Sequence, residues 1–150
     1  MRISKTLAVS AAGLSMAAAV ALPAAAGTAH HPASKGTFKS TVSPNPVHTG
    51  DKLVLKASGA KKGKSYTCVV LVIKGKNYGI GSLLGSKTAN RKGKFKCIDA
   101  SFKPFSATVA GTVRHCPTTK ADRKAGYKCG FAASTIDKTS NTISYFTAKK

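Results

Sequence analysis

The sequence predicts an all-β fold, an immunoglobulin-like β-sandwich of seven antiparallel strands with two disulfides. Three observations support this prediction. Short runs rich in β-branched and aromatic residues recur along the 150-residue chain, turn-forming clusters of Gly, Pro and Asn separate them, and no amphipathic helix of useful length follows residue 26. Several short strands at such spacing are typical of a sandwich, in which two sheets each bury one face.

The first 26 residues have the pattern of a cleaved secretory signal peptide. Arg2 and Lys5 precede an apolar run from Leu7 to Leu22, and Pro23 with a small-residue stretch follows it. A single membrane anchor is the alternative. Because the run is rich in Ala and short for a spanning helix, we expect cleavage, a secreted extracellular protein and no stable membrane insertion.

The rest of the chain divides into a flexible arm, residues 27–37, and one immunoglobulin-like domain, residues 38–150. Its length suits a single core, no long linker interrupts it, and we expect a monomer. The predicted strands are Phe38–Val42, Leu53–Ala57, Tyr66–Ile73, Phe95–Ala100, Ser106–Val113, Tyr127–Ala133 and Thr142–Thr147.

The pattern inside these runs predicts which strand is central. Leu53 and Leu55 alternate with Lys52, Val54 and Lys56, as in a strand with one buried face. In contrast, the run from Tyr66 to Ile73 is apolar almost throughout. We therefore expect this run to be a central strand that is covered on both faces.

Four cysteines, Cys68, Cys97, Cys116 and Cys129, indicate two disulfides in an exported chain. A zinc site is the alternative, but the cysteines are spread too widely for the usual short Cys-x-x-Cys spacings. Spacing alone leaves all three connectivities open.

The charge is the strongest indication of a partner. Lys and Arg number 25 against four acidic residues, so the formal net charge is +21. Such an excess favours a polyanion, either DNA or an anionic cell-envelope polymer, and Phe95 and Tyr78 are available for stacking on bases. A solvated surface without a dedicated partner is the alternative. The predicted polyanion-binding residues are Lys61, Lys62, Lys64, Lys74, Lys76, Arg91, Lys92, Lys94 and Lys96.

The sequence gives little support for catalysis, a metal or a cofactor. The four carboxylates, Asp51, Asp99, Asp122 and Asp137, are scattered, and the chain has no Glu to pair with them. The histidine pair at positions 30 and 31 is expected to be an exposed part of the arm. We therefore expect a non-enzymatic protein without metal or cofactor.

Three blocks of sequence resemble the neocarzinostatin family of secreted apoproteins, which sequester enediyne chromophores. The opening block is Thr41-Val42-Ser43-Pro44 with Ala57-Ser58-Gly59-Ala60. The closing block is Gly111-Thr112-Val113 with Cys116, followed by Cys129-Gly130-Phe131-Ala132-Ala133-Ser134 and Ile143-Ser144-Tyr145-Phe146. Between them, Phe102 and Phe105 are similar to part of the family's variable aromatic loop. The resemblance implies a disulfide between Cys116 and Cys129, which leaves Cys68 with Cys97.

The resemblance also implies a function. It favours a secreted antibiotic or antimicrobial protein that associates with DNA or another polyanion. The alternative is a carrier that holds a small aromatic, enediyne-like chromophore in a cleft between the sheets. The predicted cleft residues are Phe102, Phe105, Gly130, Phe131 and Ser134. The three phenylalanines equally suit an ordinary apolar core.

Overall fold

The computed structural model describes residues 38–150, so the predicted signal peptide and arm lie outside the described residues. The described residues form eleven strands and one short helix. These are β1 (Lys39–Ser43), β2 (Val47–His48), β3 (Leu53–Ser58), β4 (Ser65–Lys74), β5 (Asn77–Thr88), β6 (Phe95–Asp99), β7 (Phe105–Val109), β8 (Thr112–Cys116), α1 (Lys120–Lys124), β9 (Lys128–Ser134), β10 (Asn141–Phe146) and β11 (Ala148–Lys149).

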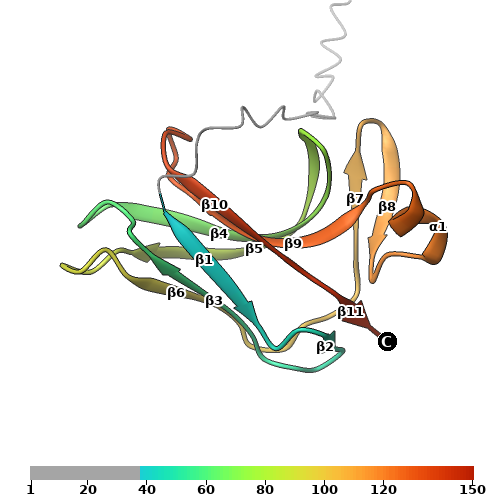
Figure 1. Ribbon diagram of the computed structural model, residues 1–150, viewed down its shortest axis with the longest axis horizontal. Coiled ribbons are helices and arrows are strands. Elements are labelled where there is room, and N and C mark those ends of the chain that lie inside the picture. Colours follow the sequence, from blue (N-terminus) through green and yellow to red (C-terminus); the bar gives the residue numbers. More distant parts are fainter. Residues whose placement is uncertain (1–37) are drawn as a thin grey trace, which may run out of the picture.

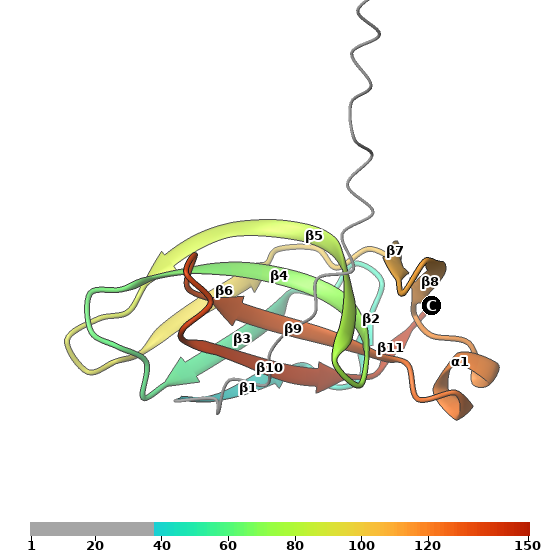
Figure 2. The same cartoon turned by 90° about the horizontal axis from the view of Figure 1, so that it is seen from above.

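Two sheets lie face to face, one above the other (Figure 1). The first has the strand order β1-β3-β6 and the second has the order β10-β9-β4-β5; every pairing in them is antiparallel. A ribbon of β7 and β8 lies with α1 at one end of the sandwich (Figures 1 and 2). The short strands β2 and β11 form a parallel pair. The predicted all-β sandwich is confirmed.

The core lies between the two sheets. Leu53 and Leu55 are fully buried on the inner face of β3, as their alternation predicts. β4 lies between β9 and β5, and its second half, from Val70 to Ile73, is buried on both faces. This confirms the prediction of a central strand. Alternate residues of a strand point to opposite faces, so β4 contributes to the core and to the outer surface of its sheet.

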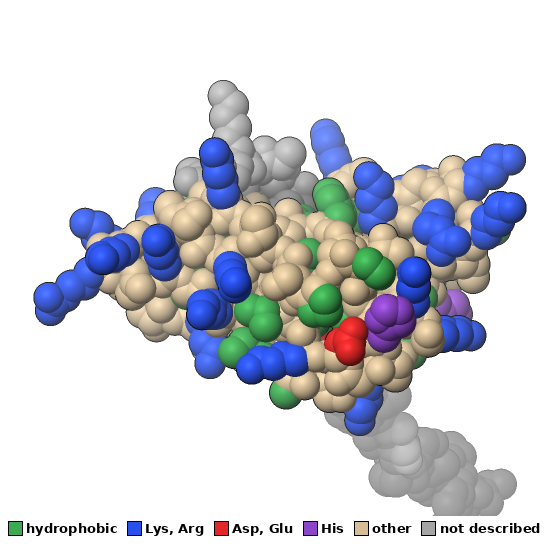
Figure 3. Space-filling model, turned by 60° about the horizontal axis from the view of Figure 1, so that its bottom comes forward, with side chains coloured by type: hydrophobic (Ala, Val, Ile, Leu, Met, Phe, Trp, Pro, Cys, Tyr) green, Lys and Arg blue, Asp and Glu red, His purple; other side chains and the backbone are tan. Residues whose placement is uncertain are grey.

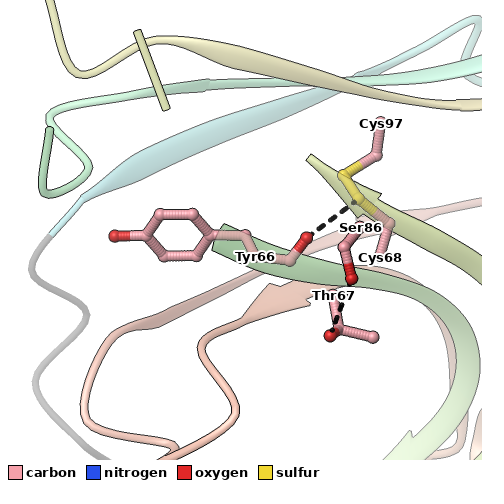
Figure 4. The surroundings of a disulfide bond; sticks show 5 residues. All are labelled: Tyr66, Thr67, Cys68, Ser86 and Cys97. Carbon is pink, nitrogen blue, oxygen red and sulfur yellow. Dashed lines mark hydrogen bonds between the residues drawn. A yellow bond between two sulfur atoms is a disulfide. The ribbon is translucent and has the colours of Figure 1, made fainter. Parts of the chain in front are cut away.

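Two disulfides tie the elements together, and their pairing is the one that the resemblance implies. Cys68 on β4 bonds to Cys97 on β6, and so links the two sheets. Figure 4 shows Cys68 reaching toward Cys97, while the neighbouring Thr67 leaves β4 on the other side and hydrogen-bonds to Ser86 at 3.3 Å. The second disulfide, Cys116–Cys129, links β8 to β9.

The predicted strand Ser106–Val113 was wrong as a single strand. The structure divides this segment into β7 and β8, which pair with each other as a hairpin. Ala110 and Gly111 form the turn, with φ of 49° and 79°. Two consecutive left-handed residues match the tight hairpin turn whose twist suits the flanking strands. The β-branched residues on both sides of the turn made the hairpin resemble one continuous run.

The longest strand, β5, was not among the predicted strands. Its sequence, Asn77–Thr88, is rich in Gly and Ser, which are residue types that strand propensity disfavours or ignores. It forms because it pairs along nearly the whole length of β4. Two of its glycines also let β7 approach closely: a Cβ on Gly79 would lie 2.4 Å from the Thr108 carbonyl oxygen, and one on Gly81 would enter the Phe105 ring.

The helix α1 is only five residues long and begins at an N-cap, Thr119. The Thr119 hydroxyl accepts a hydrogen bond from the Asp122 backbone N–H at 3.0 Å and donates one to the Asp122 carboxylate at 2.8 Å. Within residues 38–150, no helix has the length and apolar character needed to cross a membrane.

Candidate functional site

An apolar groove lies on the outer face of the four-stranded sheet, on the side away from the core. Its floor consists of Val69 and Leu71 on β4, Ala132 on β9 and Ile143 on β10. Val69, Ala132 and Ile143 are cross-strand neighbours in register, so the sheet itself sets their spacing. The groove has a volume of about 200 Å³.

Apolar side chains, half-buried or exposed, form two rims of this groove. Tyr78 and Ile80 lie on β5, and Ile136 lies in the loop between β9 and β10. Ile80 is 54% exposed and Ile136 is 96% exposed, among the most exposed large apolar side chains of the described residues. Apolar side chains that stand in water around an apolar floor offer a surface that a ligand of similar character covers favourably.

The loop that carries Ile136 is held in place by a network around Asp137. Thr135 and Thr139 donate hydrogen bonds from their hydroxyls to the Asp137 carboxylate, and the backbone N–H of Thr139 donates a third. These hydrogen bonds, the one from the Thr135 hydroxyl first, lower the pKa of Asp137 to about 2. The loop also closes on itself through the hydrogen bond from Thr135 N to the Ser140 carbonyl at 2.9 Å. Ile136 is therefore presented by an ordered loop.

Polar groups at the groove are few. The Ser134 hydroxyl donates to the Thr135 carbonyl at 3.0 Å, and the Thr67 hydroxyl hydrogen-bonds to Ser86. Lys138 is the charged side chain in the lining. An apolar floor with a few polar groups at its edge is the usual chemistry of a site for a small, largely apolar molecule.

The five predicted cleft residues do not share one face. Phe102 and Phe131 are fully buried in the core between the sheets. The Phe102 ring packs against Phe105 and Phe146, with centroid distances of 6.4 and 5.7 Å. The alternation along β9 explains the division. Phe131 points inward, whereas Gly130 and Ser134, one and three residues away from it, belong to the outer face. Only Ser134 lines the groove.

Sequence reasoning missed most of the groove. Leu71, Ala132 and Ile143 were assigned to strands but not to a site. The available signal was the run Tyr66–Ile73. It was predicted to be covered on both faces, yet the sequence contains no predicted helix that could cover the second face. At Gly130, a Cβ would lie 2.9 Å from the Leu71 Cδ1 atom and 3.3 Å from Ile143. The glycine thus leaves room for the aliphatic floor.

The nine predicted polyanion-binding residues form two groups. Backbone hydrogen bonds join the turn between β3 and β4 to the turn between β5 and β6, from Ala60 N to Gly93 O at 3.0 Å and from Gly63 N to Ala89 O at 2.9 Å. This end carries Lys61, Lys62, Lys64, Arg91, Lys92, Lys94 and Lys96. Lys74 and Lys76 flank the turn at the other end of β4, roughly 30 Å away at 3.3 Å per residue.

Lys and Arg side chains are also spread over the lower face of the molecule, and on this face acidic side chains are visible in one place, beside a histidine (Figure 3). Phe95, a predicted stacking residue, is only 7% exposed and stacks on Tyr66 at a centroid distance of 4.7 Å. Its ring is therefore part of the core, and Tyr78, the other predicted stacking residue, lines the apolar groove.

The four carboxylates do not converge on one site. Asp51 accepts a hydrogen bond from the His48 backbone N–H, Asp99 one from Ser101, and Asp122 pairs with Arg114 at 2.8 Å. Hydrogen bonds from Thr119 hold the pKa of the buried Asp122 below its ordinary value, with a smaller contribution from Arg114. Residues 38–150 contain no group of three or more His, Cys, Asp or Glu side chains that could hold a metal ion.

Comparison with known proteins places the fold. A solved structure of macromomycin, an enediyne apoprotein of the neocarzinostatin family, superposes with a TM-score of 0.57 at 16% sequence identity; the match covers 75% of this chain and 99% of that one. The fold resembles that of the neocarzinostatin family. No protein-family model matches the sequence, and no curated protein matches it either. The likeness is thus one of architecture, and it confirms the fold that the sequence resemblance implied.

Proposed function

We propose that this protein binds a small, flat, apolar molecule without covalent chemistry, in the groove on the outer face of the four-stranded sheet. The observation that carries the proposal is Ile136, which is 96% exposed on an ordered loop beside an apolar floor. A ligand that covers an exposed isoleucine removes its apolar surface from water, and this burial favours binding by about 25 cal/mol per Å². The chromophore-carrying family that the sequence and fold resemble supports the same reading.

The size of the groove limits the ligand. A volume of about 200 Å³ is below the range of roughly 300–1,000 Å³ that is usual for drug-sized ligands. We therefore expect one or two fused rings to be covered and any larger part of the ligand to remain in solvent. With about ten covered atoms, a millimolar to micromolar Kd is expected.

The test uses a neutral dye, N-phenyl-1-naphthylamine, whose fluorescence rises in apolar surroundings. We expect it to bind the intact protein, and Ala132→Phe to abolish binding because the new ring occupies the groove floor. The matched control is Ile98→Phe, which places the same ring at an exposed site on the three-stranded sheet. Equal binding by both variants would place the dye elsewhere and refute the groove as the site.

A second proposed function is polyanion binding, consistent with the antibiotic, antimicrobial or DNA-associated role expected from the sequence. It is supported by the net charge of +21 and by the basic residues gathered on two joined turns. Such binding depends on counterion release, so the affinity should fall steeply with salt. Failure to bind any polyanion at low salt would exclude it.

We also propose that the protein works outside the cytoplasm. Both disulfides need an oxidising compartment to form and persist, and the first 26 residues have the pattern of an export signal. Mass spectrometry of protein recovered from culture medium tests this. We expect a chain that lacks residues 1–26 and has no free thiol.

A further inference from the structure

The outer face of the three-stranded sheet carries four lysines around a hollow. Lys39 on β1, Lys56 on β3 and Lys96 on β6 are exposed, and Lys94 lies two residues before Lys96, hence on the same face. Lys56 and Lys96 stand directly opposite each other in the register of β3 and β6. We call the depression that these four side chains line, with a volume of about 460 Å³, the lysine hollow.

The positive charge of the lysine hollow has no acidic counterpart. All four carboxylate side chains of the chain lie within the described residues, and the ion pairs that they form there are with His48 and Arg114. Directly opposed like charges on a sheet are unfavourable, so the pair of Lys56 and Lys96 is a local cost to the fold. A bound anion removes this cost, which gives the hollow an intrinsic preference for anionic ligands.

The basic side chains elsewhere in the structure show how the hollow differs. Arg114 pairs with Asp122 and packs on the Tyr127 ring at 4.4 Å. Lys74 also lies over Tyr127, at 5.0 Å, and Lys128 lies over Tyr145. These cations contact structural partners. The four lysines of the hollow surround open space instead.

We propose that the lysine hollow binds a flexible phosphodiester polymer that carries no bases, that is, a polyol phosphate of the kind found in cell envelopes. The proposal rests on the polyanion binding proposed above and assigns both its site and its ligand. Phosphate is favoured because four lysines line one hollow and each ammonium group acts as a compact point charge. Lys56 and Lys96, on neighbouring strands, and Lys96 and Lys94, at alternate positions of one segment, are anchored about 5–7 Å apart. Lys39 is a diagonal neighbour of Lys56, at about 7–8 Å.

Two observations favour a polymer without bases over nucleic acid. The aromatic ring in the lining, Phe95, is buried against Tyr66, so it offers no platform on which a base can stack. The lining has no Arg, whose planar fork reads base edges. Duplex DNA is also stiff over about 150 base pairs, whereas the hollow is compact and requires a chain that bends into it.

The test measures binding of synthetic poly(glycerol phosphate) to the protein as a function of salt, beside single-stranded and duplex DNA at equal phosphate concentration. The test variant is Lys56→Gln with Lys96→Gln. The control is Lys120→Gln with Lys124→Gln, which removes the same charge from exposed positions of α1. Lys39→Gln with Lys94→Gln provides a second test variant. Circular dichroism verifies that the two test variants and the control fold, as expected for substitutions at surface positions.

The expected result is specific to the hollow. Each lost phosphate contact reduces the magnitude of the slope of log K against log salt by about 0.7. Each test variant removes two lysines, so the magnitude of its slope should fall by about 1.4. Between 1 M and 0.1 M salt, this variant should therefore gain roughly 25-fold less affinity than the wild type. The control should keep the wild-type slope. If both test variants bind like wild type, or the control loses as much, the site assignment is overturned while polyanion binding stands. Tighter binding of either DNA overturns the assigned ligand, and no binding to any of the three refutes the underlying function.

Discussion

Replacing Gly79 on β5 with Ala tests how the β7–β8 ribbon is held against the sandwich. The added Cβ would lie 2.4 Å from the Thr108 carbonyl oxygen, and real Cβ atoms essentially never have neighbours closer than 3.0 Å. β7 must therefore move by about 0.6 Å, the difference between these two distances. Because the obstacle is backbone, no side-chain rotation relieves it.

The magnitude follows from two opposing effects. Overpacking of this kind costs about 1–3 kcal/mol, whereas Gly→Ala recovers about 0.4–1 kcal/mol by restricting the unfolded chain. We expect a net loss of about 1–2 kcal/mol in the free energy of unfolding, or a urea midpoint lower by roughly 1 M at an m-value of about 1.5 kcal/mol/M.

The control for this experiment is Gly130→Ala, on β9. Its Cβ would meet the Leu71 Cδ1 atom at 2.9 Å, but this atom is the end of a flexible side chain and is able to move aside. We expect a clearly smaller decrease in the urea midpoint than for Gly79→Ala. If Gly79→Ala unfolds at the wild-type urea concentration, the ribbon does not pack on β5 at this distance. Gly79→Ala should also alter the apolar groove, because Tyr78 and Ile80, the two residues that flank Gly79, line that groove.

Three further predictions concern the disulfide, the buried carboxylate and the lysine pair. Replacing Cys68 and Cys97 with Ala should lower the free energy of unfolding by about 3.6 kcal/mol from loop entropy over a separation of 29 residues, measured by urea unfolding. The pKa of Asp122 in the folded protein is lowered from 3.8, so its carboxylate stabilises the fold above pH 3.8, and this stabilisation is lost as the pH falls through the folded-state pKa. Asp122→Asn should lower the free energy of unfolding by about 1–3 kcal/mol at neutral pH. In urea unfolding at decreasing pH, this variant should lose less stability in acid than the wild type. Lys56→Gln should raise the unfolding free energy by about 0.2–1 kcal/mol because it removes the repulsion from Lys96, and the gain should shrink in 1 M salt.

The fold was predictable where local sequence and burial agree. Alternation placed Leu53 and Leu55 in the core, and a continuous apolar run placed Tyr66–Ile73 at the centre of a sheet. The failures have a physical cause as well. β5 forms through pairing with β4 and through close approach to β7, and neither of these long-range effects appears in its own composition. The hairpin turn at Ala110 and Gly111 was missed because only one of its two left-handed residues is a glycine.

The candidate site was less predictable than the fold, and β9 shows why. Phe131 was predicted as a cleft residue because aromatic rings are typical of ligand pockets, but the alternation of side chains along the strand places its ring in the core. Ala132, a small and unremarkable residue in the sequence, faces the groove. Which face of a two-sided apolar strand remains open depends on what the rest of the chain places over it, and this information is not local.

The two proposed sites lie on opposite outer faces of one sandwich. This arrangement explains how a strongly basic protein can also bind an apolar ligand. An apolar groove bordered by many uncompensated charges would hold water and anions in competition with its ligand. Here, of the basic residues at positions 38–150, only Lys138 lines the groove, while four lysines line the hollow on the other sheet. With a core about 10 Å thick between the sheets, and with no residue common to both linings, charge on one face leaves the apolar chemistry of the other nearly undisturbed. The high net charge is therefore compatible with an apolar ligand, because the fold separates the two on different sheets.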